Sequence, residues 1–488
     1  MLVKLLWDLT LYSQWPHYLS GVSLFRYVLV DEFQDCDELQ ITFLKMINEN
    51  NYLFAVGDED QCIYSFRGSK PEYMVTFDKI FNGGKKIYLS INYRSNENIV
   101  SASKDVIKNN LERNNKIINS CKKTNGIIKF SSPYDERSQG EEISNIIEKS
   151  KYNISENAVL YRTNMEARSM IDTFTRRKIP FVLLDKGYNF FEHFISKDIL
   201  SYLQLAINIK DRESFLNIIN KPFRYVSKSN LEYLRNYRED KCPFDILIEK
   251  KDTPPYQAKK LDELRRDIIH LNKLSLSSAI QYVITELGYI DYLKEYAERY
   301  NQSIDDLEDI VEEFKSAADG LKTIIELLSH VERVKDSIEE SKVEKEGVIL
   351  STIHGVKGME FKNVFLINAN EETIPHRSSM EENIEEERRL FYVGITRAID
   401  NLYIFSPKTQ RGKFKDTSRF VIEGKFKEIE SNEDYGIKVN DTIFHKAYGR
   451  GLVLEINKDV IKVDFGDKIG KSFSIKVLIE NNLITVNK

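Results

Sequence analysis

The sequence predicts an α/β protein with mostly parallel sheets, an all-α insertion and a small antiparallel β-barrel at the C-terminal end. In two stretches of the chain, short apolar, β-rich runs alternate with helical periodicities, which is typical of parallel sheets covered by helices. Between those stretches, residues from about 197 to 346 show long helical periodicities and almost no strand signal. After residue 436, alternating apolar residues are separated by turn signals.

Each predicted strand of the α/β stretches stops at a polar loop. The strands are YVLV (27–30), YLFAV (52–56), KIYLS (86–90), AVLY (158–161), VILSTI (348–353), VFLIN (364–368) and LYIF (402–405). Helices are expected at 36–48, 139–149 and 165–177. Because open parallel sheets bind ligands at the carboxyl ends of their strands, these polar loops form the candidate site.

The composition is that of a globular protein of roughly two to four domains. The chain has 488 residues, of which 41% are hydrophobic and 30% charged. A net charge of -5 means that nucleic-acid binding has to come from a local groove, since the overall field repels a polyanion. The four cysteines form no CxxC pair, so they indicate neither zinc nor disulfides and fit the cytoplasm. The opening MLVKLLWDLTLY reads as the end of an amphipathic helix, and no apolar run is long enough for a membrane.

An apolar strand runs straight into carboxylates in the stretch YVLVDEFQDCDELQ (27–40). In phosphoryl-transfer enzymes, an Asp at a strand end holds magnesium and a neighbouring carboxylate orients and deprotonates the attacking water. Asp31 and Glu32 have those positions. The alternative interpretation is a buried strand that ends in a solvated turn.

The next predicted strand leads into GDEDQCIYSFRGS. Gln61 could sense a γ-phosphate, while Tyr64 and Phe66, two apart on an extended segment, could present their rings to one surface. Aromatic rings stack on unpaired bases of any kind. Aromatic alternation is, however, more often part of a core.

Three further loops carry polar residues of the same chemistry. LSINYRS places Tyr93 and Arg94 after the third strand, and VGITRA places Arg397 at the end of a helix. Arginine neutralises the dispersed charge of a transferring phosphoryl group. The loop in STIHGVKGMEF adds Thr352, His354, Lys357 and Glu360. Taken singly, such an arginine is usually a surface ion pair and such a histidine structural.

The ordered set DEFQD, GDEDQCIYSFRG, NYRS, AVLYRTN, TIHGVKGMEF and EEERRLFYVGITRA resembles the UvrD/PcrA/Rep family of superfamily-one DNA helicases, from about Tyr27 to Phe405. The resemblance implies RecA-like P-loop NTPase domains. Residues 1–92 would be the remaining part of a truncated first domain, and 93–196 with 347–425 a second domain, interrupted by a helical insertion (197–346). A linker (426–436) and a Tudor/SH3-like β-barrel (437–488), similar to the last module of PcrA-type chains, would follow.

The resemblance also implies roles for single residues. Asp31 would hold Mg²⁺ and Glu32 would be the catalytic base, with Gln61, Arg94 and Arg397 at the γ-phosphate of ATP. The adenine and ribose would lie by Tyr93, Gly358 and Glu360. Single-stranded DNA would contact Tyr64, Phe66, Thr352, His354 and Lys357.

One departure from the family concerns the phosphate loop, a GxxGxGKT-type motif that family members carry well upstream of DEFQD. The chain has only 30 residues before Asp31, and its nearest match, GDKIGKS (466–472), is one residue short and lies between β-rich runs. A phosphate cradle needs the backbone amides of a helix N-terminus, so GDKIGKS is not expected to serve. The first motor domain is therefore expected to lack its front portion.

Two functional hypotheses follow. The first is an ATP-dependent 3′-5′ helicase that acts on single-stranded and duplex DNA. Its phosphate loop would come either from an upstream polypeptide or from a front portion of the same chain that this sequence lacks. The alternative is a catalytically inactive truncated helicase that only binds DNA or a protein partner. By its resemblance, the tail would bind RNA polymerase. Nucleic-acid binding and a merely solvated surface are the competing interpretations. Nucleic-acid binding would rest on the basic residues of the tail, Lys446, Arg450, Lys468 and Lys471.

Overall fold

A computed structural model describes residues 26–48, 51–185, 187–343, 346–426, 437–446, 448–457, 460–466, 470–475, 478 and 483–487. The chain divides into two compact units, residues 1–428 and 429–488. The opening MLVKLLWDLTLY and residues 427–436 of the expected linker lie outside the described residues.

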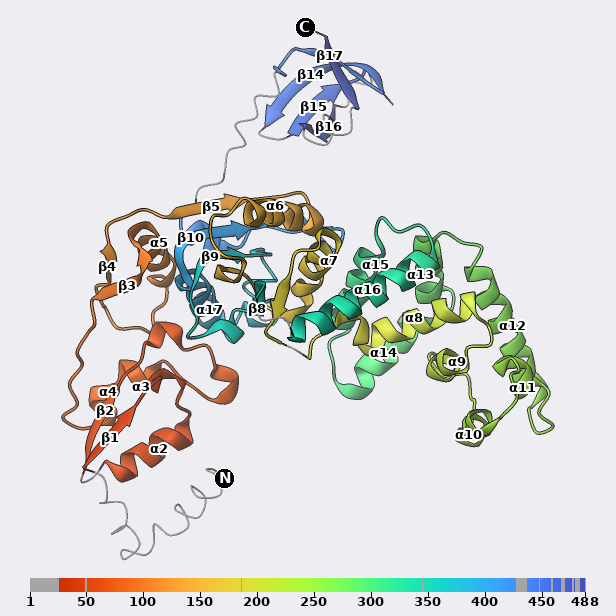
Figure 1. Cartoon of the computed structure of the whole chain (residues 1–488), viewed down its shortest axis with the longest axis horizontal. Coiled ribbons are helices and arrows are strands. Elements are labelled where there is room, and N and C mark those ends of the chain that lie inside the picture. The colour runs from red at the N-terminus through yellow and green to blue at the C-terminus, as the bar shows by residue number, and fades with distance from the viewer. Residues whose placement is uncertain are drawn as a thin grey trace, which may run out of the picture. The chain divides into compact units, whose positions relative to one another are not determined.

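The first unit begins with a small parallel sheet of two strands, β1 (Tyr27–Val30) and β2 (Tyr52–Ala55). Helices α2 (Glu38–Ile47), α3 (Glu72–Val75) and α4 (Phe77–Ile80) lie beside it (Figure 1). On one face of this sheet, every second side chain of the two strands packs against a core centred on Phe33 and Phe81. The side chains on the opposite face are apolar and 60–76% exposed: Tyr27, Leu29, Tyr52 and Phe54.

The main sheet has six strands in the order β5-β10-β9-β6-β8-β7, and all of its pairs are parallel. The strands are β5 (Ile127–Ser131), β6 (Asn157–Tyr161), β7 (Phe181–Leu183), β8 (Val348–Thr352), β9 (Phe361–Leu366) and β10 (Ala398–Phe405). The predicted parallel α/β arrangement is thus confirmed, and it fits a RecA-like fold.

Both faces of the six-stranded sheet are covered by helices. Leu402 and Ile404 of β10 face a core with α5 (Glu97–Ile107) and α17 (Ile384–Thr396). Tyr403 and Phe405 face the opposite core with α6 (Glu136–Glu148) and α7 (Ala167–Arg177). The alternation is that of a sheet buried on both sides.

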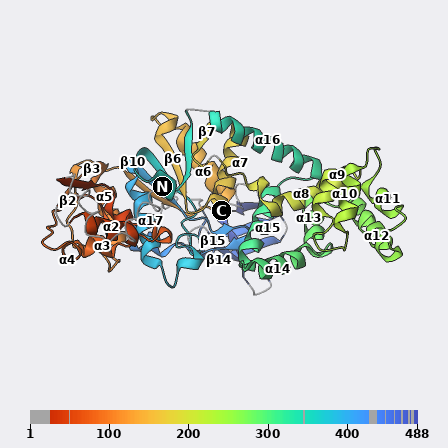
Figure 2. The same cartoon turned by 90° about the horizontal axis from the view of Figure 1, so that it is seen from below.

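Between β7 and β8 the chain is helical, and the described residues from 194 to 343 contain no strand. The helices lie to one side of the main sheet (Figures 1 and 2) and share one continuous core with it. They are α8 (Phe194–Ile207), α9 (Arg212–Ile218), α10 (Lys228–Asn236), α11 (Pro243–Ile248), α12 (Pro255–Leu271), α13 (Leu276–Thr285), α14 (Tyr289–Tyr300), α15 (Ile304–Ala318) and α16 (Ile324–Val343).

Two local predictions were wrong. The expected strand KIYLS (86–90) is not a strand, because β3 starts only at Ile91 (Ile91–Asn96) and pairs with β4 (Asn119–Lys122). Tyr93 and Arg94 therefore lie within a strand rather than after one. Strand propensity depends on a partner, and Ile87 and Leu89 have none among the described residues and are 84–85% exposed. The segment around Phe66 is a 3₁₀ turn (Ser65–Arg67) rather than extended.

The second unit is an antiparallel sheet in the order β16-β15-β14-β13-β17. Its strands are β13 (Thr442–His445), β14 (Gly449–Asn457), β15 (Val460–Asp464), β16 (Lys471–Ser474) and β17 (Ile484–Asn487). The predicted antiparallel character is confirmed, whereas closure into a barrel stays a prediction. Of the stretch GDKIGKS, residues 467–469 lie outside the described residues, and Lys471 and Ser472 lie in β16 rather than at the helix N-terminus that a phosphate cradle needs.

A search of the described helices found none with the length and apolar character needed to cross a membrane.

Candidate active site

The turn after β1 is held by one buried glutamine. Gln34 Nε2 donates to Glu32 Oε2 (2.5 Å), and Gln34 Oε1 accepts from the backbone N–H of Asp58 after β2 (3.0 Å). Glu32 itself has a left-handed backbone (φ 50°, ψ 42°). A side chain on Gly57 would collide with Gln34 Oε1. The glutamine thus fixes the Glu32 carboxylate at the carboxyl ends of both strands.

Asp31 is exposed beside this turn, and one of its oxygens accepts the backbone N–H of Glu32 (2.9 Å). No group of three or more metal ligands occurs among the described residues. Magnesium in nucleotide enzymes is held by one or two carboxylates plus the phosphates, so the donors present here fit this ion.

Lys357, which follows β8, reaches across to the β1 turn. Its Nζ lies 2.6 Å from Asp35 Oδ2 and 3.6 Å from Glu32 Oε2, and it donates to the carbonyl of Gln61 (3.2 Å). Its side chain is only 10% exposed. In this structure Lys357 therefore binds carboxylates, and its expected contact with DNA stays a prediction.

Arg397 is a buried cation at the C-terminal end of α17, 1% exposed. Its guanidinium donates to the carbonyls of Val393 (3.0 Å) and Met359 (3.3 Å) and to Gln61 Oε1 (3.3 Å). None of the described carboxylates forms an ion pair with it. Burial and the nearby charge of Arg94 lower the pKa of Arg397 to about 10. A buried guanidinium without a counter-ion is costly unless an anion binds it.

Arg94 and its neighbours lie at the same place. Arg94 Nε donates to Glu360 Oε2 (2.6 Å) and Nη1 to the carbonyl of Thr396 (3.3 Å), next to Arg397. The Tyr93 ring is 72% exposed and open to a stacking partner. Gly358 has a φ of 85°, and a Cβ added to it would meet nothing within 4 Å. Its left-handed backbone, rather than crowding, therefore favours glycine.

An aromatic cluster joins the segment after β2 to the loop after β8, across the cleft between the β1–β2 sheet and the main sheet. The ring centroids of Tyr64, Phe66 and His354 are 5.9–6.1 Å apart in all three pairs. Phe66 is 70% exposed. Burial, assisted by the charge of Arg162, lowers the pKa of His354 to about 4, so its ring is neutral at pH 7. Thr352 ends β8 and accepts the backbone N–H of Gly355 (3.2 Å).

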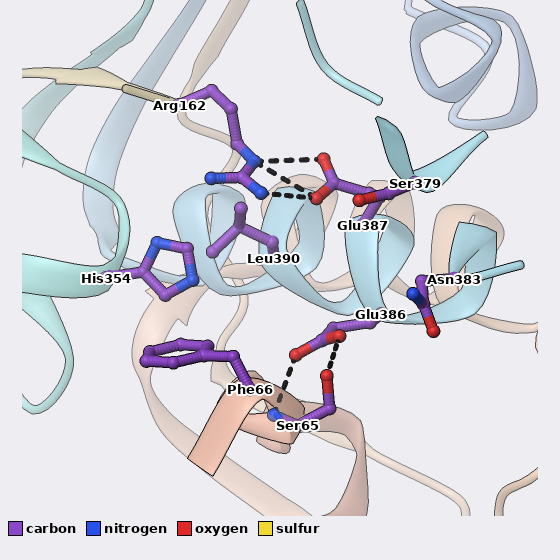
Figure 3. Close-up of a pocket in the computed structure, with 9 residues that line it drawn as sticks. All are labelled: Ser65, Phe66, Arg162, His354, Ser379, Asn383, Glu386, Glu387 and Leu390. Carbon is purple, nitrogen blue, oxygen red and sulfur yellow. Dashed lines mark hydrogen bonds and ion pairs between the residues drawn. The ribbon is translucent and has the colours of Figure 1, made fainter. Parts of the chain in front are cut away.

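A pocket of about 670 Å³ opens beside this cluster (Figure 3). Phe66 and His354 line one side of it. Arg162, which follows β6, forms a bidentate ion pair with Glu387 of α17 (2.7–3.1 Å). Glu386 accepts from the backbone N–H of Ser65 (2.9 Å) and from its hydroxyl. The pocket thus joins aromatic and polar groups from both sides of the cleft.

The structure brings most of the predicted residues together in two adjoining places. Gln61, Arg94, Glu360 and Arg397 form one group, and Tyr64, Phe66 and His354 form the other. Sequence reasoning did not single out the residues that hold these groups in place: Gln34, Asp35, Arg162, Glu386 and Glu387. The last three lie inside the quoted stretches AVLYRTN and EEERRLFYVGITRA, which was the available signal.

Two family models and several curated relatives match the chain. Residues 87–409 match the UvrD-like helicase C-terminal domain, and residues 13–82 match the UvrD/REP helicase N-terminal domain. The chain is 34% identical over 416 residues to a putative ATP-dependent DNA helicase, YjcD, of Bacillus subtilis, covering 82% of this chain and 54% of the relative. It is 31% identical over 513 residues to the ATP-dependent DNA helicase PcrA of Staphylococcus epidermidis, covering 93% and 69%.

The PcrA of Staphylococcus aureus is 30% identical over 498 residues, covering 89% of this chain and 67% of the relative. The chain thus spans about half the length of YjcD and about two thirds of PcrA. The matched domains cover the residues of both groups in the cleft, so the chain belongs to the UvrD/REP helicase family.

Proposed function

We propose that the chain is the larger part of an ATP-dependent DNA helicase that moves 3′-5′ on single-stranded DNA and unwinds duplex. The observation that carries this proposal is Arg397, a buried guanidinium without a carboxylate partner among the described residues, which contacts Gln61 across the cleft. Such a charge suits the γ-phosphate of a nucleotide. The names of the relatives support the same activity.

The nucleotide would lie between the β1–β2 side and α17. Arg397 and Arg94 would neutralise the γ-phosphate, and Gln61, already bound to Arg397, would sense its presence. Tyr93 would stack on the base, and Glu360 would orient Arg94 through their 2.6 Å contact. Gly358 lies two residues from Glu360, where a bulky side chain would be costly at its positive φ.

Asp31 would hold magnesium, which neutralises charge on the phosphates. Glu32 would orient and deprotonate the attacking water, because Gln34 and the turn fix its carboxylate at the strand ends. The rings of Tyr64, Phe66 and His354, with Thr352 and Lys357 beside them, would form the path of single-stranded DNA.

ATP hydrolysis further requires a phosphate loop, and no GxxxxGK[ST] segment occurs in the 488 residues. We therefore propose that the cleft works only with a polypeptide segment that supplies this loop. The bare apolar face of the β1–β2 sheet supports this, because parallel strands are normally covered on both faces. The 488-residue chain alone is expected to hydrolyse ATP poorly even with DNA present.

The test combines the chain with the loop-bearing part of a PcrA relative and measures DNA-stimulated ATP hydrolysis. We expect turnover by the combination, and Glu32→Gln should abolish it while nucleotide binding persists, since the amide keeps the shape but cannot accept a proton. Lys45→Gln, an exposed change on α2, is the matched control. Normal turnover by the Glu32→Gln variant would show that the base is misassigned, and strong turnover by the chain alone would disprove the loop requirement.

A catalytically inactive protein that only binds DNA or a partner is the second candidate. The absence of a phosphate-loop motif from the 488 residues favours it. If the combined assembly binds single-stranded DNA but shows no turnover, this second candidate replaces the first.

The DNA path is tested separately. Replacing both Tyr64 and Phe66 with Ala should weaken single-strand binding by about 1 to 3 kcal/mol per lost stack, without a change in sequence preference. A titration at fixed salt measures this. Unchanged affinity for single-stranded DNA would show that the two rings have a structural role instead.

For the second unit we propose binding of RNA polymerase, by β-augmentation on an exposed strand edge. The order β16-β15-β14-β13-β17 leaves β16 and β17 as edges among the described strands, which supports this. Residues 437–488 alone would be tested against the polymerase and against DNA at physiological salt. Tight DNA binding without polymerase binding would instead assign the tail to nucleic acid.

A further inference from the structure

A second pocket, of about 490 Å³, lies on the α6 side of the main sheet at its β5 edge. Its lining comes from β5, β9, β10 and the C-terminal end of α6, and it shares no residue with the Phe66–His354 pocket. That first pocket lies at the carboxyl ends of β6 and β8, where Arg162 and His354 follow the strands. The second pocket is therefore a separate place on the molecule.

Three lysines line this second pocket: Lys129 of β5, and Lys149 and Lys151 at the end of α6. All three are exposed, and none forms an ion pair with a described carboxylate. Two acids of neighbouring segments bind other partners: Glu148 pairs with Arg177 (2.6 Å), and Asp400 pairs with Lys362 (3.5 Å) and accepts the Tyr152 hydroxyl (3.1 Å). Lys151 lies over the Tyr152 ring (5.2 Å to its centroid), so its contact is aromatic rather than ionic. The three lysines thus carry positive charge without a carboxylate partner among the described residues, in a chain whose net charge is -5.

Two amide side chains in the lining of the pocket, Asn401 and Asn145, have N–H groups that can still donate. Asn363 Nδ2 donates to Ser150 Oγ (3.1 Å), and Asn363 Oδ1 accepts one N–H of Asn401 (2.8 Å). Asn401 Oδ1 accepts the backbone N–H of Ile127 (3.0 Å), so its second amide hydrogen is available. Asn145 Oδ1 accepts from Arg177 (2.8 Å), which leaves its amide hydrogens as donors. No carboxylate lines the pocket.

Cations are also favoured at the C-terminal carbonyls of a helix, and this accounts for Lys149 and Lys151. It does not account for Lys129, which projects from a strand into the same hollow. The lysine ammonium is a point charge that binds phosphate oxygens.

We propose that this lysine pocket binds backbone phosphates of DNA, as a second contact on the α6 side of the main sheet. The proposal rests on the proposed function, because it adds a contact for the same polyanion. The single strand engaged by Phe66 and His354 carries phosphates beyond that cluster, and about three of them would be neutralised by the three lysines.

The test is the salt dependence of single-strand binding by the full chain with Lys129, Lys149 and Lys151 all changed to Gln. Each phosphate contact contributes about 0.7 to the slope of log K against log salt. We expect the slope of the triple variant to be smaller in magnitude by about 2, with weaker binding at low salt. Duplex DNA and inorganic polyphosphate serve as competitors.

A matched triple variant, Lys104→Gln, Lys273→Gln and Lys335→Gln, removes the same charge from three exposed, separated positions and should leave the slope close to that of the unaltered chain. If the pocket variant keeps the original slope while Phe66→Ala still weakens binding, the lysine pocket does not bind DNA phosphates, and the proposed function stands. If the unaltered chain binds no DNA, both fall. A slope that falls equally in the two triple variants would also overturn the pocket, because it would reflect net charge alone.

Discussion

Arg397 and Arg168 are both buried arginines, but their surroundings differ. Arg168 of α7, 5% exposed, pairs with Glu313 of α15 and with Asp172 (2.5 Å). Although burial opposes it, Glu313 raises the pKa of Arg168, whereas Arg397, without such a partner, has a lowered pKa. The paired buried cation joins two elements of the fold, while the unpaired one contacts only neutral oxygens among the described residues, which is the arrangement that the proposed phosphate contact needs.

Arg411 extends the paired region. Its Nε donates to Glu313 (2.7 Å), and its backbone N–H donates to Glu136 of α6 (3.1 Å). Arg168 and Arg411 outweigh the effect of burial and lower the pKa of Glu313. One carboxylate of the insertion thus meets two cations of the main-sheet region.

Replacing Arg397, the unpaired arginine, is expected to have the largest effect. In the assembly supplied with a phosphate loop, Arg397→Ala should lower ATP turnover by about 10³-fold or more, as for other arginines that stabilise phosphoryl transfer. The free energy of unfolding should not fall greatly, because the change removes an uncompensated buried charge. Steady-state kinetics and urea unfolding of the same variant measure the two quantities. A large loss of stability with normal turnover would make Arg397 structural.

On the structural side, Glu313→Ala should lower the free energy of unfolding by about 3 to 5 kcal/mol, because it leaves Arg168 and Arg411 buried without their shared partner. Urea unfolding measures this loss. Glu312→Ala, next along α15 with a partly exposed Lys315 contact, is the control and should cost about 1 kcal/mol or less. Equal losses in both variants would contradict the comparison.

Gly57→Ala tests the turn that holds Glu32, and its expected effect is smaller. The new methyl would collide with Gln34 Oε1. We expect a loss of about 1 to 3 kcal/mol in the free energy of unfolding and lower turnover, since Gln34 also holds Glu32. The control is Gly83→Ala, which has open space but an unfavourable φ of 83°. A Gly57→Ala variant with full stability would show that Gln34 can move at no cost.

The paired region also predicts a pH dependence of the free energy of unfolding. Burial and the nearby Glu313 carboxylate raise the pKa of Glu136 to about 7 from an ordinary 4.5. Between pH 4.5 and 7 the folded chain therefore keeps a proton on Glu136 that the unfolded chain releases. The free energy of unfolding falls as pH rises through this window, by at most about 1.4 kcal/mol per pH unit. Glu136→Gln should flatten the profile measured by urea unfolding. An unchanged profile would refute the raised pKa.

The sequence predicted much of this molecule, for identifiable reasons. The predicted strands YVLV, AVLY and VILSTI are apolar runs with clear stops, and the structure has strands at Tyr27–Val30, Asn157–Tyr161 and Val348–Thr352. KIYLS (86–90) has the same local pattern, but only its last residue, Ser90, bonds to β4, and Ile87 and Leu89 pair with no described strand. Such pairing is not visible in the run itself. Periodicity gives the type of an element, whereas its partner is decided by the rest of the fold.

Side-chain pairing was beyond sequence reasoning. Lys357 and Asp35 are 322 positions apart, and nothing local shows that the lysine turns toward a carboxylate rather than toward DNA. The same holds for Arg168 and Glu313, which are 145 positions apart. Arg397 and Arg168 look alike as arginines in helical stretches, and only their neighbours in space distinguish them.

Lys357 gives the cleft a thermodynamic linkage. The residue belongs to the loop that carries His354, yet its ammonium neutralises Asp35 and Glu32 beside Asp31. A DNA strand that displaced this loop would withdraw the cation and leave the carboxylates free to attract a divalent ion. Strand occupancy and magnesium affinity would then favour one another, and reciprocity requires that each raise the other by the same factor. Under the proposed function, a single lysine would thus make DNA and magnesium bind cooperatively.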